Sequence, residues 1–328
     1  MTETASPLLL NLDFKDNSRL SEFKLCPRKF WFHYIQHLVP AYPRYPLDFG
    51  SAWHKGMDFL YINFFENGIR GIELGKIAFE GFLQEWAELG HPPEIPIGDE
   101  VKFKARTPGT AREMFMNYVK TRTQWLETLE LVEVELPFAV PIDPDKPNRW
   151  LVGRLDKIIK EKGYHWVVEH KTNSLYSIEH GMQAGFTDMF DPNAQVDGYG
   201  YALKMLYGAK SMGVLVDAAL VHKTHHDIFK FIPVNKAVGF ASQWLEDTIY
   251  WWDRVEEAEE GKHYARNCPS ACRTVYGACE YKGICNYTTG HKDFDEAPAG
   301  YKFDKWEPFS FDELKKAMGA EKVESEVI

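Results

Sequence analysis

The sequence lacks any hydrophobic run that approaches the roughly 18 residues needed to cross a bilayer. Its first residues hold no basic stretch and only a short apolar one, which argues against a secretory signal. We therefore expect a soluble, cytoplasmic protein with no membrane association.

The chain also lacks an excess of basic residues: 38 Lys and Arg stand against 48 Asp and Glu, a net charge of −10. This argues against a protein that coats nucleic acid by bulk charge. Basic residues nevertheless gather in two places, residues 19–29 and residues 102–106. A local basic groove therefore remains compatible with the composition.

Cysteine is scarce, and its odd count of five disfavours a disulfide framework. Cys268, Cys272, Cys279 and Cys285 lie close together, whereas Cys26 lies far away in the sequence. Clustered thiols in such a chain more often bind metal, yet the paired CxxC knuckles of structural zinc sites are missing. Four thiolates suit either tetrahedral zinc or a [4Fe–4S] cluster, and the spacing leaves both open.

Apolar periodicity predicts a series of helices, with a break at Cys26-Pro27 and an N-cap at Asn17 or Ser18 in the first. The predicted helices cover residues 17–37, 51–66, 70–89, 109–129, 192–207, 236–260 and 310–320. Alternating and β-branched stretches predict strands. These cover residues 131–140, 148–160, 164–171, 212–221 and 227–234.

The order of these elements predicts four regions along the chain. They are an N-terminal helical region (1–129), a mixed strand and helix core (130–260), a cysteine-rich segment (261–290) and a polar tail (291–328).

Two of the predicted strands bring acidic residues together. If Lys162-Gly163 forms a two-residue hairpin turn, Asp156 lies directly opposite Glu169 on one face, and Lys171 shares that face. Opposed carboxylates cost energy unless a cation lies between them, and their oxygens suit Mg²⁺ or Mn²⁺. The alternative is a cluster of surface salt bridges on an exposed strand.

Neighbouring motifs bear on this choice. Gly50–His54 reads GxxxH, Gly153–Asp156 reads GxxD, Glu169–Lys171 reads ExK and Gln195–Tyr199 reads QxxxY. In this order and spacing the set resembles the RecB-like PD-(D/E)xK nucleases, over roughly residues 18–290. Leu155 stands where the superfamily has proline, but the following carboxylate is the metal-binding group.

The resemblance implies an α/β fold with a restriction-endonuclease-like core, in which helices flank a central mixed β-sheet. It implies that His54, Asp156 and Glu169 bind Mg²⁺ or Mn²⁺ together with the backbone carbonyl of His170. Asp156, Glu169 and Lys171 would be the catalytic residues, with Lys171 as the catalytic lysine.

The same resemblance implies DNA-binding roles for Gln195, Tyr199 and Arg154. Gln195 and Tyr199 are also an i, i+4 pair, so a helix places both on one face. Arg154 is expected at a phosphate, although pairing with a nearby acid is the plain alternative.

The cysteines resemble those of the iron–sulfur subset of these nucleases, in which the cluster joins the two ends of the chain. Cys26, Cys272, Cys279 and Cys285 would then hold a [4Fe–4S] cluster, with Cys268 as a possible substitute for Cys272. The segment Tyr276–Tyr281 resembles the region of the later ligands.

These features together predict a metal-dependent DNA exonuclease that acts on DNA ends, single-stranded ends included. The setting would be recombination, repair, or phage or CRISPR DNA processing in a bacterial, archaeal or phage-infected cell. The alternative is a DNA-binding or assembly subunit that uses a nuclease fold within a helicase or CRISPR integration complex. A cysteine-rich zinc protein of unrelated function would leave the ordered motifs unexplained.

Overall fold

The computed structural model describes residues 12–96, 98, 100–177, 181–236, 239–274, 277–307 and 309–318. The chain divides into two compact units. The first unit comprises Met1–Pro43, Pro137–Gly153 and Ala237–Ile328, and the second comprises Arg44–Leu136 and Arg154–Lys236. These units follow from contacts within the chain, and the division into four regions stays a prediction.

Four helices of the second unit contribute to one apolar core. They are α3 (Tyr45–Phe65), α4 (Gly71–Glu88), α5 (Glu100–Phe103) and α6 (Pro108–Leu126). Helix α6 begins where the Thr107 hydroxyl accepts a hydrogen bond from the Thr110 amide at 3.2 Å. Trp53 of α3 stacks on Phe115 of α6 with ring centroids 4.2 Å apart, and neither side chain is exposed. Apolar burial of this kind is the main stabilising term for such helices.

Glycines allow these helices to approach one another closely. A Cβ added at Gly56 of α3 would collide with the ring of Phe115 and lie 2.7 Å from the carbonyl oxygen of Ala78. The same addition at Gly81 of α4 would lie 2.7 Å from the ring of Phe59. The close approach of α3, α4 and α6 therefore requires glycine, which has no side chain, at these two positions.

A mixed β-sheet accompanies the helices, in the order β1-β4-β5-β8-β9, with β3 paired to β4. The strands are β1 (Asp13–Lys15), β3 (Glu130–Pro141), β4 (Arg149–Glu161), β5 (Tyr164–Asn173), β8 (Ser211–Leu220) and β9 (Phe229–Val234). Strands β4 and β5 form an antiparallel hairpin in which Glu161 pairs with Tyr164. The turn residues Lys162 and Gly163 both have positive φ, as a two-residue type I′ turn requires.

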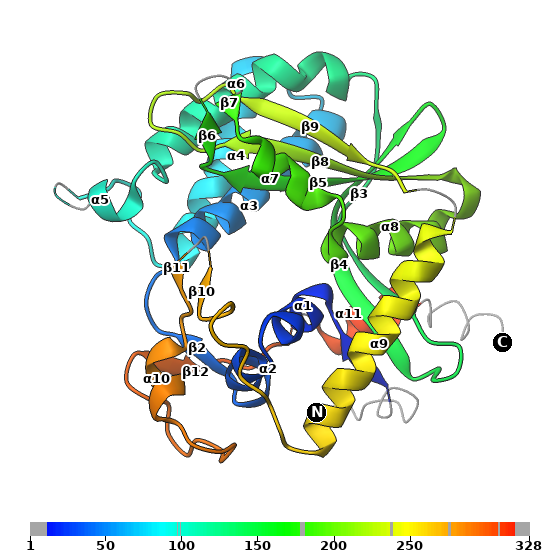
Figure 1. Ribbon diagram of the computed structural model, residues 1–328. Helices are drawn as coiled ribbons and strands as arrows, with labels where there is room; N and C mark the ends of the chain where they lie inside the picture. The colour runs from blue at the N-terminus through cyan, green and yellow to red at the C-terminus, as the bar shows by residue number, and fades with distance from the viewer. Residues whose placement is uncertain are drawn as a thin grey trace, which may run out of the picture. The chain divides into compact units, whose positions relative to one another are not determined.

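Strands β5 and β8 run parallel, so a crossover must join them. It contains β6 (Tyr176–Ser177), β7 (Gly181–Met182), α7 (Ala184–Thr187), η2 (Asp188–Phe190), α8 (Ala194–Tyr207) and η3 (Gly208–Lys210). Val168 of β5 belongs to the core formed with α3, α4 and α6, whereas Lys171 contacts Gln195 of α8. Because alternate strand residues face opposite sides, helices cover both faces of this part of the sheet (Figure 1).

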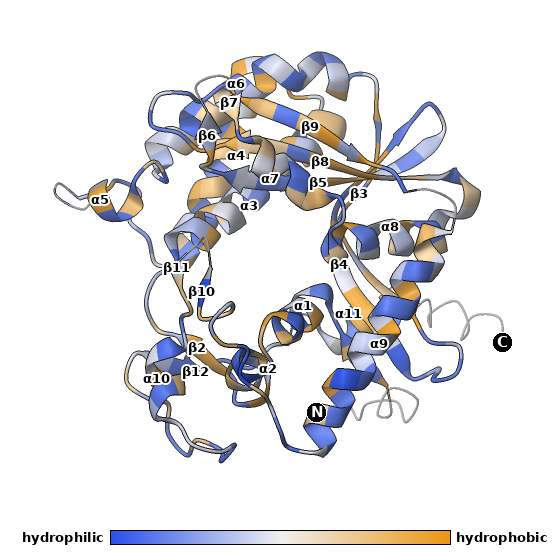
Figure 2. Ribbon diagram, in the orientation of Figure 1, coloured by the Kyte–Doolittle hydropathy of each residue, from blue (hydrophilic) through white to orange (hydrophobic). Residues whose placement is uncertain are grey.

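The first unit contains the long helix α9 and otherwise short elements. They are β1, α1 (Asn17–Leu25), α2 (Pro27–Phe30), the π-helix η1 (Trp31–Ile35), β2 (Leu38–Pro40), α9 (Phe240–Glu260), β10 (Arg273–Thr274), β11 (Gly277–Ala278), α10 (Lys282–Tyr287), β12 (Tyr301–Phe303) and α11 (Phe311–Ala317). Strand β1 pairs with the start of β4, and β12 pairs with β2. Helix α9 carries both hydrophilic and hydrophobic residues along its length (Figure 2), and α1 packs on it.

Arg149 ties the start of β4 to α9 within the first unit. Its side chain is fully buried, and its guanidinium donates hydrogen bonds to Asp143, Asp253 and Glu256 at 2.5–2.9 Å. Three carboxylates around one guanidinium leave this buried charge fully paired.

The predicted fold class, a central mixed sheet flanked by helices, is confirmed. The break in the first helix is also confirmed, since Cys26 has extended backbone angles between α1 and α2. The predicted cap was wrong: Asp16 caps α1, because its carboxylate accepts from the Arg19 amide at 2.6 Å. Among the described residues, no helix is both long and apolar enough to cross a membrane.

We expect Gly56→Ala to lower the free energy of unfolding by about 1–3 kcal/mol, because the new methyl group overpacks the crossing of α3 with its neighbours. Urea unfolding followed by circular dichroism would measure this. Gly200→Ala on α8 is the matched control, since its Cβ meets nothing within 4 Å. That change should be neutral or stabilise by up to about 1 kcal/mol, and equal effects of the two substitutions would contradict the packing argument.

Candidate active site

The β4–β5 hairpin brings the two predicted carboxylates together. The pairing runs from Glu161↔Tyr164 to Lys157↔Val168, which confirms the predicted register. One further step in this register places Asp156 opposite Glu169. Asp156 Oδ2 accepts a hydrogen bond from the His170 amide at 3.1 Å across the two strands.

Both carboxylates are buried and each has a cationic neighbour. Asp156 is 8% exposed and Glu169 is 1% exposed. Lys171 Nζ contacts Glu169 Oε1, and His54 Nδ1 of α3 lies 2.9 Å from Asp156 Oδ2. Glu169 Oε2 is buried with no hydrogen-bond partner. This unpaired oxygen leaves capacity for a further donor or a cation.

The surroundings shift the pKa values of Asp156 and Glu169 in opposite directions. Burial disfavours the charge on Asp156, but His54, Lys157 and Lys171 outweigh it and hold its pKa well below the ordinary value. Burial and the neighbouring Asp156 charge raise the pKa of Glu169. Burial alone would lower the pKa of His54, yet Asp156 raises it above its usual value. Asp156 is therefore the firmly ionised member of the pair.

The donor chemistry fits a hard divalent cation. Within the described ranges, no three His, Cys, Asp or Glu side chains are arranged to hold a metal ion. Mg²⁺ is often bound through one or two carboxylates, with water and substrate phosphate supplying the other ligands. Asp156 and the unpaired oxygen of Glu169 meet that lesser requirement, with Lys171 and His54 as their present partners.

The His170 side chain faces away from this pair. It is fully buried and contacts the rings of Tyr61 and Tyr118 edge-on, at centroid distances of 5.5 and 6.3 Å. Burial holds the pKa of His170 well below its ordinary value, so the ring is neutral. Only the backbone of His170 is therefore available on the side of Glu169.

The helix residues predicted to bind DNA lie beside Lys171. Gln195 Oε1 accepts a hydrogen bond from Lys171 Nζ at 3.2 Å, and Gln195 Nε2 donates to the Tyr199 hydroxyl at 2.9 Å. The i, i+4 pair thus shares one face of α8, as predicted. Asn193 caps this helix, because its side chain accepts hydrogen bonds from the amides of Gln195 and Val196. The cap holds Gln195 in the first turn of α8.

Charged side chains of the second unit line an open cavity of about 770 Å³. His54 and Asp58 line it from α3, Arg154 and Asp156 from β4, and Lys171 from β5. Arg154 Nη1 donates to the carbonyl oxygen of Glu135 at 3.4 Å. The pairing with an acidic residue that the sequence left open for Arg154 is thus present, since its Nε lies 3.9 Å from Glu135 Oε2.

Sequence reasoning missed the charged residues Lys55, Asp58, Glu85 and Glu135, which line this cavity, and Lys157, which contacts two of them. Lys157 is fully buried; its Nζ lies 2.6 Å from Asp58 and 3.9 Å from Glu135. Glu135 has a φ of 54°, which only a few per cent of non-glycine residues adopt. The sole sequence signal is Lys157 itself, a charge in an otherwise apolar strand stretch.

The cysteines of the first unit gather at a second cavity, of about 110 Å³. All five thiols are free, and all five line it. Cys26 enters from the break between α1 and α2, and Cys285 enters from α10. The Sγ atoms of Cys268 and Cys272 lie 3.3 Å apart. Cys268 therefore lies directly beside Cys272, the residue for which it is the possible substitute.

Basic residues surround the thiols. Arg28, Lys29, Arg266 and Lys282 line the same cavity. The hydrogen bond with Cys268 raises the pKa of Cys272 to about 11, and burial raises that of Cys279. The cations would offset the negative charge of bound thiolates. Tyr276, part of the predicted ligand region, lies outside the described residues.

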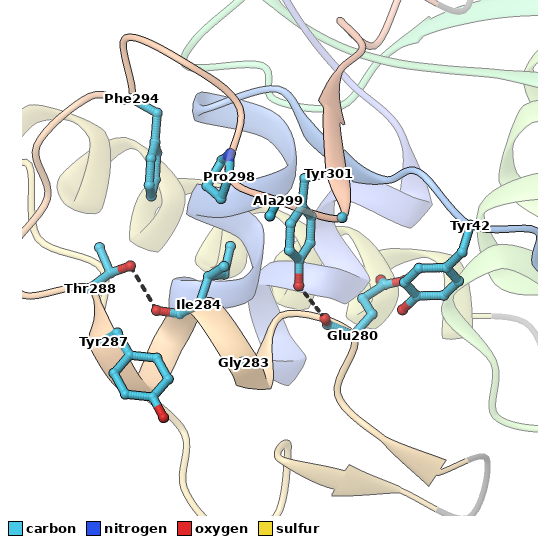
Figure 3. Close-up of a pocket in the computed structure, with 11 residues that line it drawn as sticks. Tyr42, Glu280, Gly283, Ile284, Tyr287, Thr288, Phe294, Pro298, Ala299 and Tyr301 are labelled. Carbon is cyan, nitrogen blue, oxygen red and sulfur yellow. Dashed lines mark hydrogen bonds between the residues drawn. The ribbon is translucent and has the colours of Figure 1, made fainter.

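A third cavity, of about 580 Å³, lies beside α10 and is mainly apolar (Figure 3). Two of its hydroxyls serve internal contacts: Tyr301 donates to the Glu280 carbonyl, and Thr288 donates to the Ile284 carbonyl at 2.7 Å. Figure 3 shows Phe294 and Pro298 on the loop opposite α10. The cavity thus joins the segment after residue 290 to the cysteine-rich segment.

Comparisons with known proteins agree with the motif order. The family model of the PD-(D/E)XK nuclease superfamily matches residues 17–286. A search of curated proteins finds no match. Among solved structures, the chain resembles a protein of Eubacterium rectale whose exonuclease name is provisional. The two are 12% identical over 87% of this chain and 97% of that one, with a TM-score of 0.48. At that TM-score the likeness carries no weight for fold or function.

We expect Glu135→Gln to change how stability depends on pH. Burial and the Asp156 charge raise the pKa of Glu135 to about 7. The folded state therefore binds more protons than the unfolded state between about pH 4.5 and pH 7, and stability falls as pH rises through this window. The glutamine variant lacks this loss. Relative to the natural protein it should gain about 1 kcal/mol between about pH 5 and pH 8, since a third of the side chain is screened by solvent.

Urea unfolding at each pH would measure the difference. Glu133→Gln is the matched control, because Glu133 lies two residues earlier on β3 and is exposed. A constant offset for Glu135→Gln across the pH range would show that Glu135 carries no raised pKa.

Proposed function

Since the chain belongs to the PD-(D/E)XK nuclease superfamily, we propose that it is a Mg²⁺- or Mn²⁺-dependent DNA exonuclease acting at DNA ends. The observation that carries this proposal is the meeting of Asp156, Glu169 and Lys171 at the β4–β5 hairpin, where Asp156 and Lys171 line an open cavity. A surface salt-bridge cluster would leave both carboxylates exposed, whereas both are buried. DNA is the substrate that this superfamily implies.

Asp156 and Glu169 would hold the divalent cation, with His54 and the His170 carbonyl as the further proposed ligands. When bound, such a cation polarises the phosphodiester and lowers the pKa of a coordinated water. Asp156 is suited to this role because it stays ionised even at low pH. Glu169 becomes a stronger ligand once a cation offsets the Asp156 charge that raises its pKa.

Lys171 would act on the phosphate and the attacking water. Burial opposes its charge, but Glu169 and Asp156 raise its pKa, so the ammonium stays protonated. A fixed ammonium can orient the water and stabilise negative charge that develops on the phosphate oxygens. Gln195 limits where the ammonium can lie, and Tyr199 in turn holds Gln195. Gln195 therefore positions Lys171 as well as lining the DNA path.

We expect Asp156→Asn and Lys171→Ala each to slow DNA cleavage at least about a hundredfold, because each removes charge stabilisation at the phosphate. The assay is digestion of end-labelled single- and double-stranded DNA with Mg²⁺ or Mn²⁺, against EDTA. Product ladders from the label separate trimming at ends from internal cuts.

Lys160→Ala is the matched control, since Lys160 lies on the same strand near the turn and pairs with Glu130. It should cleave as the natural protein does. Cleavage that persists in Asp156→Asn and Lys171→Ala would remove this site from the reaction.

For the first unit we propose a [4Fe–4S] cluster held by Cys26, Cys272, Cys279 and Cys285. The support is that all five cysteines of the chain line one cavity with four cationic side chains. Asn267 strengthens the link between the ends of the chain, since its amide group donates to the Leu25 carbonyl at 2.7 Å. The cluster would be structural, because it joins residue 26 to the segment after residue 260.

We expect protein purified without chelator to be brown and to contain iron and acid-labile sulfide in about fourfold molar amounts. Cys272→Ser should lose the colour, whereas Cys268→Ser should keep it, since the proposed ligands include Cys272 and not Cys268. Colourless protein with stoichiometric zinc would replace the cluster by a zinc site. Colour lost only in Cys268→Ser would exchange the two ligands.

A further inference from the structure

Three aromatic rings meet beyond the ends of strands β5 and β8, and we call them the ring cluster: Tyr176, His222 and His225. Their centroids lie 4.7 Å (Tyr176 to His222), 5.0 Å (Tyr176 to His225) and 4.8 Å (His222 to His225) apart. The last two pairs are stacked, with interplanar angles of 22° and 29°. All three side chains are half-buried, so part of the cluster faces solvent.

The ring cluster lies at the edge of the sheet where β5 ends, close in sequence to the proposed catalytic lysine, Lys171. Strand β5 carries Lys171 and ends at Asn173, and Tyr176 follows three residues later. Strand β8 runs parallel and ends at Leu220, which pairs with Asn173. The Val221 amide then donates to the Asn173 carbonyl at 2.7 Å, one residue before His222. Parallel strands end at one edge, so the rings lie next to the active-site end of the hairpin.

The loop that carries the histidines is held in shape. His222 Nδ1 accepts hydrogen bonds from the amides of Thr224 at 3.2 Å and His225 at 3.3 Å. A Cβ on Gly181 of β7 would lie in contact with Ile228, so the β6–β7 hairpin packs against the end of this loop. A ligand that stacks on the rings would therefore order little additional chain.

The charge around the rings suits an anionic polymer. Lys223 and Lys230 are exposed on the histidine loop and its continuation into β9, with Asp227 as the acid between them. Arg106 Nη2 donates to the Ser174 hydroxyl at 3.1 Å, which brings one of the basic residues of the 102–106 run to the end of β5. Basic side chains beside aromatic rings are the usual surface for single-stranded nucleic acid.

Polar atoms near the rings also lack partners. Asn173 is 7% exposed, and its Nδ2 is buried without a hydrogen-bond partner. Nε2 of His226 is buried and unpartnered as well. Buried donors without partners are uncommon and call for a ligand or water. Asn173 precedes Tyr176 by three residues, and His226 directly follows His225.

The arrangement does not suit a metal ion. Stacked imidazoles direct their ring nitrogens along roughly parallel planes rather than toward one point. Across the part of the chain that the structure describes, no group of three metal-ligating side chains is formed.

We propose that the ring cluster is a stacking platform for a base of single-stranded DNA, one that positions the strand for cleavage at Asp156 and Glu169. This rests on the proposed nuclease function for its substrate. Every base offers a π face, so the platform would bind strands without reading their sequence. A base within a duplex is already stacked on both sides and gains nothing from the rings.

The test measures binding of a short single strand that carries 2-aminopurine at each position in turn, in EDTA, where cleavage is blocked. We expect bases at one or two positions to lose fluorescence when bound by the natural protein. Tyr176→Leu and His225→Leu should abolish that loss and weaken binding at least about fivefold. Tyr176→Phe should retain both, because the ring remains.

Tyr164→Leu and His165→Leu are matched controls, since this Tyr-His pair begins β5, at the end of that strand away from the ring cluster. Both should bind as the natural protein does, and thermal melting of each variant checks that it is folded. Unchanged quenching and affinity in folded Tyr176→Leu and His225→Leu would overturn the platform. So would an equal loss of affinity for an end-blocked duplex, because that loss would reflect general charge or shape.

Cleavage assays keep this inference separate from the proposed function. If quenching depends on the rings but no metal supports cleavage, the platform stands and the nuclease proposal fails. If cleavage depends on Lys171 but not on the rings, and binding is unchanged, the platform alone fails.

Discussion

Two buried carboxylates face each other across the β4–β5 hairpin, and the charged groups of the second unit are arranged around them. Asp156 and Glu169 would repel one another in a low-dielectric interior, so their burial requires positive charge close by. Lys171 and His54 supply it from β5 and α3. A cation can take over the same role, because the arrangement already concentrates negative charge at one point. The burial of this pair and the proposed cation site therefore have the same origin, the opposition of Asp156 and Glu169 in the hairpin.

Charged residues next to Asp156 and Glu169 are paired in the same way. Lys157 lies fully buried between Asp58 and Glu135, so a second lysine supports the ionised state of Asp156. Glu135 reaches that place through a backbone conformation that costs energy for a side-chain-bearing residue. Strain and burial are thus concentrated around the cavity, which is where they are expected in a catalytic protein.

Local sequence rules were sufficient for the hairpin and for most elements. Lys162-Gly163 is a turn signal with a known geometry, and that geometry alone sets the pairing of Asp156 with Glu169. Long-range features were beyond these rules. Neither the approach of Asp58 to Lys157 nor the positive φ of Glu135 has a local signature, since each depends on how α3 and β3 pack. The rings of Tyr176 and His225 are far apart in sequence, and only the parallel pairing of β5 with β8 brings them together.

The order in which segments contribute to each unit has a consequence for how the chain is made. Strand β1 pairs with residues 149–151, and α1 packs on α9, which ends at residue 260. Cys26, at the break between α1 and α2, lines a cavity together with residues that follow position 265. During synthesis the N-terminal segment therefore leaves the ribosome long before any of its partners exist. Its apolar face must wait until α9 has been made. Assembly of the first unit is in this sense a late event, since its segments are made both before and after those of the second unit.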